Sequence, residues 1–218
     1  MTRVPFPQRR RGGTYRAARL ALAALAASTL LGACAPLVVG GAVVGSALMV
    51  TDRRTSGAQV EDQAIELKAG PRLREVLGDR GHINVTSYNR AVLLSGEVPT
   101  AADRATAEQT IARMENVRSV LNELAVMGNS SITARSNDSF VTTRVKAALV
   151  DAKDLHATAF KVVTERGVVY LLGRVTEREA ARATEIARGV PGVLKVVRVF
   201  EILTEAELAD LQPKPAPK

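Results

Sequence analysis

The chain has 218 residues, of which 46% are hydrophobic and 24% are charged, and it contains no tryptophan. This length allows one medium-sized domain or two small ones. The formal net charge is +8, but six of the 30 basic residues lie within residues 1–33, which contain no acidic residue. The other 24 basic residues nearly balance the 22 acidic ones. We therefore predict that the high pI does not reflect nucleic-acid binding and that the protein has no nucleic-acid partner.

The N-terminal region has the pattern of an exported lipoprotein. Arginine-rich residues 1–19 precede the apolar run Leu20–Leu31, which is too short to span a membrane. The run ends in Leu-Gly-Ala-Cys34, which matches the lipobox of bacterial lipoproteins. The match implies cleavage before Cys34 and lipid attachment to this residue, the only cysteine in the chain. Ala35 follows where the usual inner-membrane retention signal has aspartate, so the match implies an anchor in the outer membrane, on its periplasmic face.

These features divide the first part of the chain. Residues 1–33 are predicted to be the signal peptide, and residues 34–60 a lipidated apolar tether. The uninterrupted apolar stretch of this tether, Leu37–Val50, has fourteen residues, which is below the length of a membrane span. We therefore expect the tether to lie at or near the bilayer surface.

Two later segments share one pattern. Residues 83–98, INVTSYNRAVLLSGEV, align with residues 160–175, FKVVTERGVVYLLGRV, at a constant offset of 77. Both segments alternate apolar residues along two strands that are joined by a turn. Thr100 with Asp103, and Thr176 with Glu179, then form capping boxes that begin a helix. A repeat of this length, present twice, predicts two copies of one small domain.

Both copies are predicted to have the element order α-β-β-α-β. The first copy, residues 61–128, has a helix at Asp62–Leu77, kinked or divided by Gly70-Pro71, a hairpin, a helix at Ala101–Met114 and a strand at Val117–Val126. Residues 129–135 are predicted to be a polar linker. The second copy, residues 136–203, has a helix at Asp138–Val150, a hairpin at Ala157–Val175, a helix at Glu177–Gly189 and a strand at Val193–Leu203. The proline-rich residues 204–218 are predicted to be a loose tail.

Reactive side chains are too few and too scattered for an enzyme or a metal protein. His82 and His156 are not equivalent in the repeat, and neither belongs to a His-x-x-x-His or Cys-x-x-Cys pattern. The sequence has no serine-nucleophile motif and no phosphate-binding glycine loop. Asp151 and Asp154 flank Lys153 near a helix end, as solvated surface residues do. We therefore predict no catalytic residue, no metal and no cofactor.

The first helix of the second copy has two distinct faces. At 100° per residue, one stripe is predicted to pack on the sheet: Val141, Val145, Ala148 and Leu149. The opposite side holds Phe140, Thr143, Ala147 and Val150, flanked by Arg144 and Lys146. An outward aromatic residue between two cations is typical of a helix that lies on an anionic membrane. The alternative is that Phe140 turns sideways into the interface between the two copies.

Charge and sheet pattern distinguish the copies further. Residues 61–128 hold 8 basic and 10 acidic side chains, whereas residues 129–203 hold 12 basic and 8 acidic ones. This split indicates an acidic partner for the second copy, unless it is drift on solvated faces. Val168, Tyr170 and Leu172 lie on the sheet face away from the helix stripe, so that face needs a second cover. The cover is either the other copy or a protein partner.

The element order, the Leu-x-Gly-x-Val strand and the capped helix resemble the BON domain. The strongest matches are residues 137–149, NDSFVTTRVKAAL, residues 163–180, VTERGVVYLLGRVTEREA, and residues 189–196, GVPGVLKV. Two such domains behind a lipobox resemble the dual-BON outer-membrane lipoproteins. The resemblance implies an α+β fold of two tandem BON domains, in each of which two helices cover a three-stranded mixed sheet.

The same resemblance implies a function. Dual-BON lipoproteins are expected to bind anionic phospholipid through the first helix of the second domain and to support outer-membrane integrity. The helix that matches carries Phe140 where the family pattern allows tryptophan, so its aromatic anchor is smaller. The alternative is a non-enzymatic scaffold that contacts the outer-membrane protein assembly machinery and uses lipid only as an anchor. The sequence leaves the oligomeric state open.

The lipobox gives a direct prediction. Replacing Cys34 with alanine removes the only acceptor for the lipid, so the Cys34→Ala protein should be soluble or unprocessed. Fractionation of cells and intact-mass measurement of the mature protein will check this. A mature protein with a free thiol at Cys34 would contradict the prediction.

Overall fold

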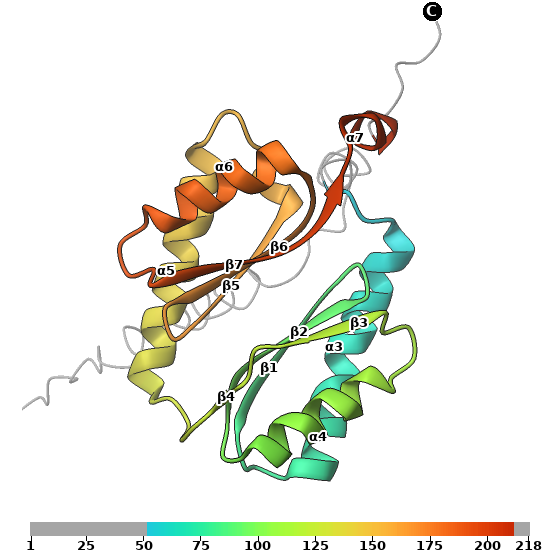
Figure 1. Ribbon diagram of the computed structural model, residues 1–218, viewed down its shortest axis with the longest axis vertical. Coiled ribbons are helices and arrows are strands. Elements are labelled where there is room, and N and C mark those ends of the chain that lie inside the picture. Colours follow the sequence, from blue (N-terminus) through green and yellow to red (C-terminus); the bar gives the residue numbers. More distant parts are fainter. Residues whose placement is uncertain (1–51, 212–218) are drawn as a thin grey trace, which may run out of the picture. The chain divides into compact units, whose positions relative to one another are not determined.

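The computed structural model describes residues 52–211 (Figure 1). The predicted signal peptide, Cys34, most of the predicted tether and residues 212–218 lie outside the described residues. Within residues 52–211 the chain is α+β, with two mixed sheets that are each packed against helices. None of the helices in this range is long and apolar enough to cross a membrane.

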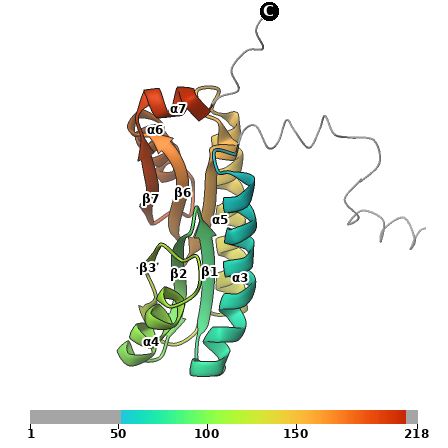
Figure 2. The ribbon, with the colours of Figure 1, turned by 90° about the vertical axis from the view of Figure 1, so that its right-hand side faces the viewer.

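The first copy of the repeat has the predicted element order. Its elements are α3 (Ser56–Leu77), β1 (His82–Tyr88), β2 (Ala91–Val98), α4 (Ala101–Ala112), β3 (Ser119–Asn122) and β4 (Ala125–Val126). Strands β1 and β2 are antiparallel, and β3 and β4 are two pieces of a third strand that pairs in parallel with β2. Helices α3 and α4 cover this sheet (Figure 1), and α3 runs alongside β1 (Figure 2).

The second copy repeats the arrangement. Its elements are α5 (Ile132–Asp151), a short 3-10 turn (Ala157–Ala159), β5 (Phe160–Glu165), β6 (Val168–Thr176), α6 (Glu177–Arg188) and β7 (Lys195–Leu203). The strand order β5-β6-β7 is again antiparallel and then parallel. Helices α5 and α6 cover one face of the sheet.

Several predicted boundaries were wrong, and the reasons are physical. Helix α3 begins six residues early because Thr55 caps it, accepting the N–H of Ala58 at 3.1 Å. It also continues through Pro71 as one helix, since Ala69 and Leu73 are buried on either side. Buried apolar residues thus stabilise a turn that proline weakens.

Three other elements also differ from expectation. Helix α5 begins at Ile132, so the predicted linker forms its first turn behind the Ser131 cap. The third strand of the first copy is interrupted where the Asn122 side chain accepts the N–H of Leu124 at 3.2 Å, a local bond that competes with the ladder. Part of the predicted tail forms α7 (Glu205–Leu211). Its N-terminus is capped reciprocally: the N–H of Glu207 donates to the Thr204 hydroxyl, and the N–H of Thr204 donates to the Glu207 carboxylate.

Each hairpin turn is held by an aspartate from the helix that precedes it. Asp62 of α3 accepts the backbone N–H groups of Asn89 and Arg90 at 2.7 and 2.8 Å. Asp138 of α5 accepts those of Arg166 and Gly167, both at 2.8 Å. Both residues of each turn have positive φ, as the favoured two-residue hairpin turns require. These buried aspartates fix the register between helix and hairpin in both copies.

The repeated glycine of the Leu-x-Gly-x-Val strand has a steric role. A Cβ atom at Gly96 would lie 2.0 Å from the carbonyl oxygen of His82, and one at Gly173 would lie 2.5 Å from that of Ala159. Any larger residue would therefore push the beginning of the hairpin away from the central strand. The close approach explains why glycine stands at the same place in both copies.

The second face of each sheet is covered by the other copy, as one of the two alternatives predicted. Leu93 and Tyr88 of the first copy form one buried cluster with Tyr170 and Leu172 of the second. We call this cluster the seam. Burial raises the pKa of both tyrosines to about 12. The two sheets therefore pack face to face, with helices on their outer faces.

Polar contacts surround the apolar seam. Lys161 of β5 donates to Glu66 at 2.6 Å, and Asn89 donates to Glu201 of β7 at 2.7 Å. Asn84 of β1 donates to the buried carboxylate of Glu165 at 2.6 Å. These bonds join residues more than 80 positions apart and fix how the two sheets face each other.

Glu165 should make the seam sensitive to pH. Burial raises the pKa of its carboxyl above the ordinary 4.5, and the nearby Glu97 and Asp138 add to this, although the bond from Asn84 opposes it. Protons therefore bind the folded state more tightly, so the free energy of unfolding should fall as pH rises from about 4.5. The Glu165→Gln protein should be more stable than the wild type at pH 7, and not at pH 4. Urea unfolding at both pH values, with exposed Glu115→Gln as the control, will check this; equal stability at pH 7 would contradict it.

Candidate functional site

Helix α5 has the two faces that its sequence predicts. Val141, Val145 and Leu149 are at most 1% exposed and pack against the β5-β6-β7 sheet and α6. This inward stripe leaves the opposite side of the helix without protein cover. The outward residues therefore face solvent along a well-packed helix.

The outward face holds all six residues that the sequence singles out. Phe140 and Val150 are 65% and 68% exposed, and Thr143, Arg144, Lys146 and Ala147 are also exposed. The Thr143 hydroxyl donates to the carbonyl oxygen of Ser139 at 3.0 Å, so its hydrogen is already bonded within the helix. The alternative placement of Phe140, in the interface between the copies, is wrong; Tyr170 and Leu172 occupy that interface instead.

The turn between α6 and β7 extends this face, which the sequence did not predict. A guanidinium nitrogen of Arg144 lies 3.5 Å from the carbonyl oxygen of Pro191, and a Cβ at Gly192 would touch Val141. Leu194, in the same turn, is 82% exposed. Its backbone N–H donates to the carbonyl oxygen of Gly167 at 2.8 Å, which fixes the turn beside the β5-β6 hairpin.

Four exposed cations belong to the same helix, hairpin turn and strand region as these apolar side chains. Arg144, Lys146, Arg166 and Lys195 are all exposed. Among residues 52–211, no carboxylate lies within 4.0 Å of any of their charged nitrogens. Asp138, the acidic residue of this half of α5, is buried and accepts two backbone bonds. We call Phe140, Leu194 and the four cations the basic tip.

The other end of α5 has a different character. Val150 precedes the exposed Asp151, and Asp154 pairs with Arg182 at 3.0 Å. The exposed Asp151 repels an anionic surface, the exposed Lys153 attracts it, and Arg182 is already paired with Asp154. Electrostatics therefore favours the Phe140 end of α5 over the Val150 end as a place for an anionic partner.

Helix α3, the counterpart of α5, also exposes apolar side chains. Val60 and Leu67 are 66% and 77% exposed. Glu61 and Glu66 lie next to them in the chain, and Glu66 is bonded to Lys161 across the seam. The face of α3 therefore mixes these glutamates with the exposed cations Lys68 and Arg72, whereas the charged residues of the basic tip are all cations.

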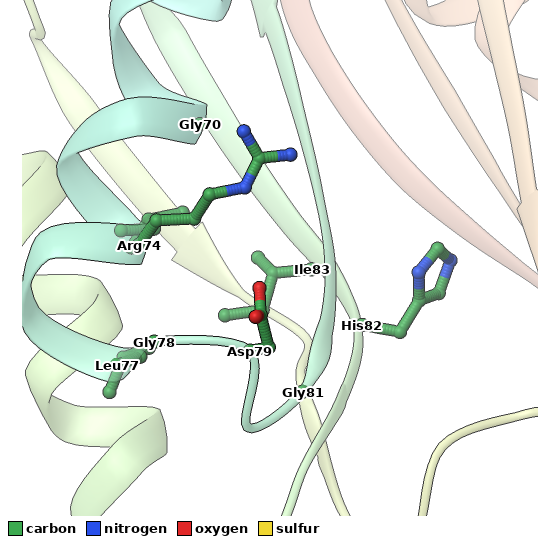
Figure 3. Close-up of a pocket in the computed structure, with 9 residues that line it drawn as sticks. Gly70, Arg74, Leu77, Gly78, Asp79, Gly81, His82 and Ile83 are labelled. Carbon is green, nitrogen blue, oxygen red and sulfur yellow. The ribbon is translucent and has the colours of Figure 1, made fainter.

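A pocket of about 220 Å³ lies at the C-terminal end of α3 (Figure 3). Arg74 extends over it from the helix, whereas the ring of His82 points away from the other side chains. The pocket contains none of the residues that the sequence singles out for function. Within the described part of the chain, no group of three His, Cys, Asp or Glu residues is placed to hold a metal ion.

Comparison with known proteins agrees with the repeat. The sequence profile of the BON domain matches residues 62–128 and 137–204. The chain is 38% identical over 181 residues to the protein named outer membrane lipoprotein DolP of Haemophilus influenzae, covering 82% of this chain and 93% of that one. It is 36% identical over 151 residues to a protein named 21 kDa hemolysin of Actinobacillus pleuropneumoniae, covering 68% and 78% of the two chains.

A shorter similarity reaches a third protein. The osmotically inducible protein Y of Escherichia coli is 36% identical over 111 residues, which cover 49% of this chain and 51% of that one. The similarity to DolP, by contrast, covers nearly the whole length of DolP and therefore includes both copies of the repeat.

Proposed function

The chain belongs to the BON-domain family, and from that membership and the geometry of α5 we propose that it is an outer-membrane-anchored lipoprotein that binds anionic phospholipid through its second BON domain. Family membership identifies it as a non-enzymatic protein. The anchor is the lipid on Cys34, and the supporting observations are the lipobox and the similarity to an outer membrane lipoprotein. Phospholipid binding in turn supports the integrity of the outer membrane.

The basic tip carries this proposal. Phe140 and Leu194 supply two exposed apolar side chains that can enter the boundary between headgroups and acyl chains. Each cation near an anionic membrane surface contributes about 1 kcal/mol, and the basic tip contains four. Transfer of a whole phenylalanine or leucine side chain from water contributes about 1.5–3 kcal/mol, and partial insertion contributes less. The two terms together suit weak, reversible binding beside a covalent lipid anchor.

The second candidate, a scaffold for the outer-membrane protein assembly machinery, has less support. It would be favoured by an open apolar sheet face, but the two BON domains cover those faces for each other at the seam. Scattered exposed apolar side chains, among them Val60 and Leu67 of α3, remain for such a partner. Binding of phospholipid vesicles by the chain without its lipid separates the two candidates.

Charge at the tip should control binding at low salt. In the unlipidated fragment 51–218, the double change Arg144→Glu and Lys146→Glu should abolish flotation with anionic vesicles at low ionic strength, because it reverses two of four cations. Both side chains are exposed, so thermal unfolding should not change. The matched control reverses two exposed cations of α3, Lys68 and Arg72, and should float. Flotation of the Arg144→Glu, Lys146→Glu protein would show that α5 is not the site.

Apolar insertion should be visible directly. The chain has no tryptophan, so Phe140→Trp creates a single fluorescent reporter at the tip. Its emission should be quenched by anionic vesicles with brominated acyl chains, and high salt should not abolish quenching once the protein is bound. Val150→Trp, at the acidic end of α5, should be quenched several-fold less. Equal quenching of both reporters would mean that the whole helix, and not its Phe140 end, lies on the membrane.

A further inference from the structure

The segment Asp52–Arg54, just before the α3 cap Thr55, contacts both BON domains. Arg53 donates two hydrogen bonds of 2.7 Å to the two carboxylate oxygens of Glu179, at the start of α6. It also donates to the carbonyl oxygen of Arg174 at 2.9 Å, and Arg174 donates back to the carbonyl oxygen of Arg53 at 2.8 Å. The side chains of Arg53 and Glu179 are 7% and 3% exposed. A residue upstream of the first domain is thus buried against the second, 126 positions away.

The next residue contacts the first domain. Arg54 pairs with Asp62, the aspartate that holds the β1-β2 turn, at 2.8 Å, and with Asp52 at 2.7 Å. Its guanidinium also lies 4.4 Å from the ring centroid of Tyr88, which belongs to the seam. Burial opposes the charged form, but the bonds to Asp52 and Asp62 outweigh it and raise the pKa of Arg54. Two adjacent arginines therefore reach different domains.

The repeat shows that the contact to the second domain is special. In the first domain, the capping acid of α4, Asp103, pairs with Arg80 of the same domain at 3.0 Å. The corresponding acid of the second domain is Glu179, which accepts the capping bond from the N–H of Thr176. Its cationic partner is Arg53, from outside that domain. The second domain therefore depends on a cation that only the upstream segment supplies.

We propose that Arg53 and Arg54 form a clasp that fixes the end of the tether to both BON domains at once. The membrane anchor at Cys34 then holds the domain pair as one unit, and does not hold the second domain only through the first. The segment Asp52–Arg54 is 18 positions downstream of Cys34 at its start, so the clasp marks where the tether ends.

The two arginines of the clasp stabilise different parts of the protein, so the loss of each one should have a different effect. Loss of Arg53 leaves the buried Glu179 carboxylate without its cation, and a buried charge that loses its partner is strongly destabilising. Glu179 also caps α6, so the effect should appear in α6 and the adjoining end of β6. Loss of Arg54 removes a partner of Asp62, so its effect should appear at the Asn89-Arg90 turn and β1.

Hydrogen–deuterium exchange on fragment 51–218 will test the clasp, with Arg53→Ala and Arg54→Ala as a matched pair of neighbouring changes. Arg53→Ala should raise amide exchange at least ten-fold in peptides covering residues 174–184, and Arg54→Ala should do so in peptides covering residues 84–92. Each variant should affect the other region less. Loss of protection only in the first domain for both variants, or in neither region, would overturn the proposal.

A second measurement covers the case in which Arg53→Ala does not fold. Arg53→Lys keeps the charge but loses the paired bonds to Glu179, and it should give an intermediate rise in exchange at residues 174–184. Combining Arg53→Ala with Glu179→Gln removes the unpaired charge, so the double variant should regain most of the protection lost in Arg53→Ala. If the loss of protection in the double variant equals the sum of the losses in the two single variants, the two residues do not act together.

Discussion

The face-to-face contact of the two sheets is the interaction on which the rest of the structure depends. A three-stranded sheet with apolar side chains on both faces cannot leave either face in water. In each domain the helices cover one face, and Leu93, Tyr88, Tyr170 and Leu172 cover the other for both domains together. The domains are therefore halves of one folded unit, and their outer helices are what each presents to other molecules.

The two halves have diverged on those outer helices while keeping the same interior. The turn-binding aspartates, the close-approach glycines and the helix caps are shared. The surface of α5 has an aromatic residue beside the cations Arg144 and Lys146, whereas the surface of α3 places its apolar residues beside both glutamates and Lys68. The two copies therefore share one interior and differ in the side chains beside their exposed apolar residues, which is the difference on which the proposed lipid site rests.

Sequence patterns predicted what depends on local spacing, and missed what depends on contacts across the chain. The alternation in 160–175, the Thr176 cap and the inward stripe of α5 follow from residues a few positions apart. The unbroken helix through Pro71 depends on packing against the sheet, and the place of Leu194 beside α5 depends on the fold of the whole domain. The role of Arg53 depends on Glu179, 126 positions later. The Thr204-x-x-Glu207 pattern is a capping signal for α7, but it begins a segment whose proline-rich end predicted a loose tail.

The aspartates that hold the hairpin turns free the turns themselves from a common sequence constraint. Turns with two positive-φ residues usually need asparagine or glycine, because these tolerate the conformation best. Here the carboxylate of Asp138 binds the two N–H groups of the turn from the neighbouring helix, so an arginine can hold a φ of 54° at position 166. Hydrogen bonds inside the domain offset the strain of that conformation. The exposed side chain of the turn can therefore vary without loss of the turn. A hairpin end built this way can change its charge without changing its shape.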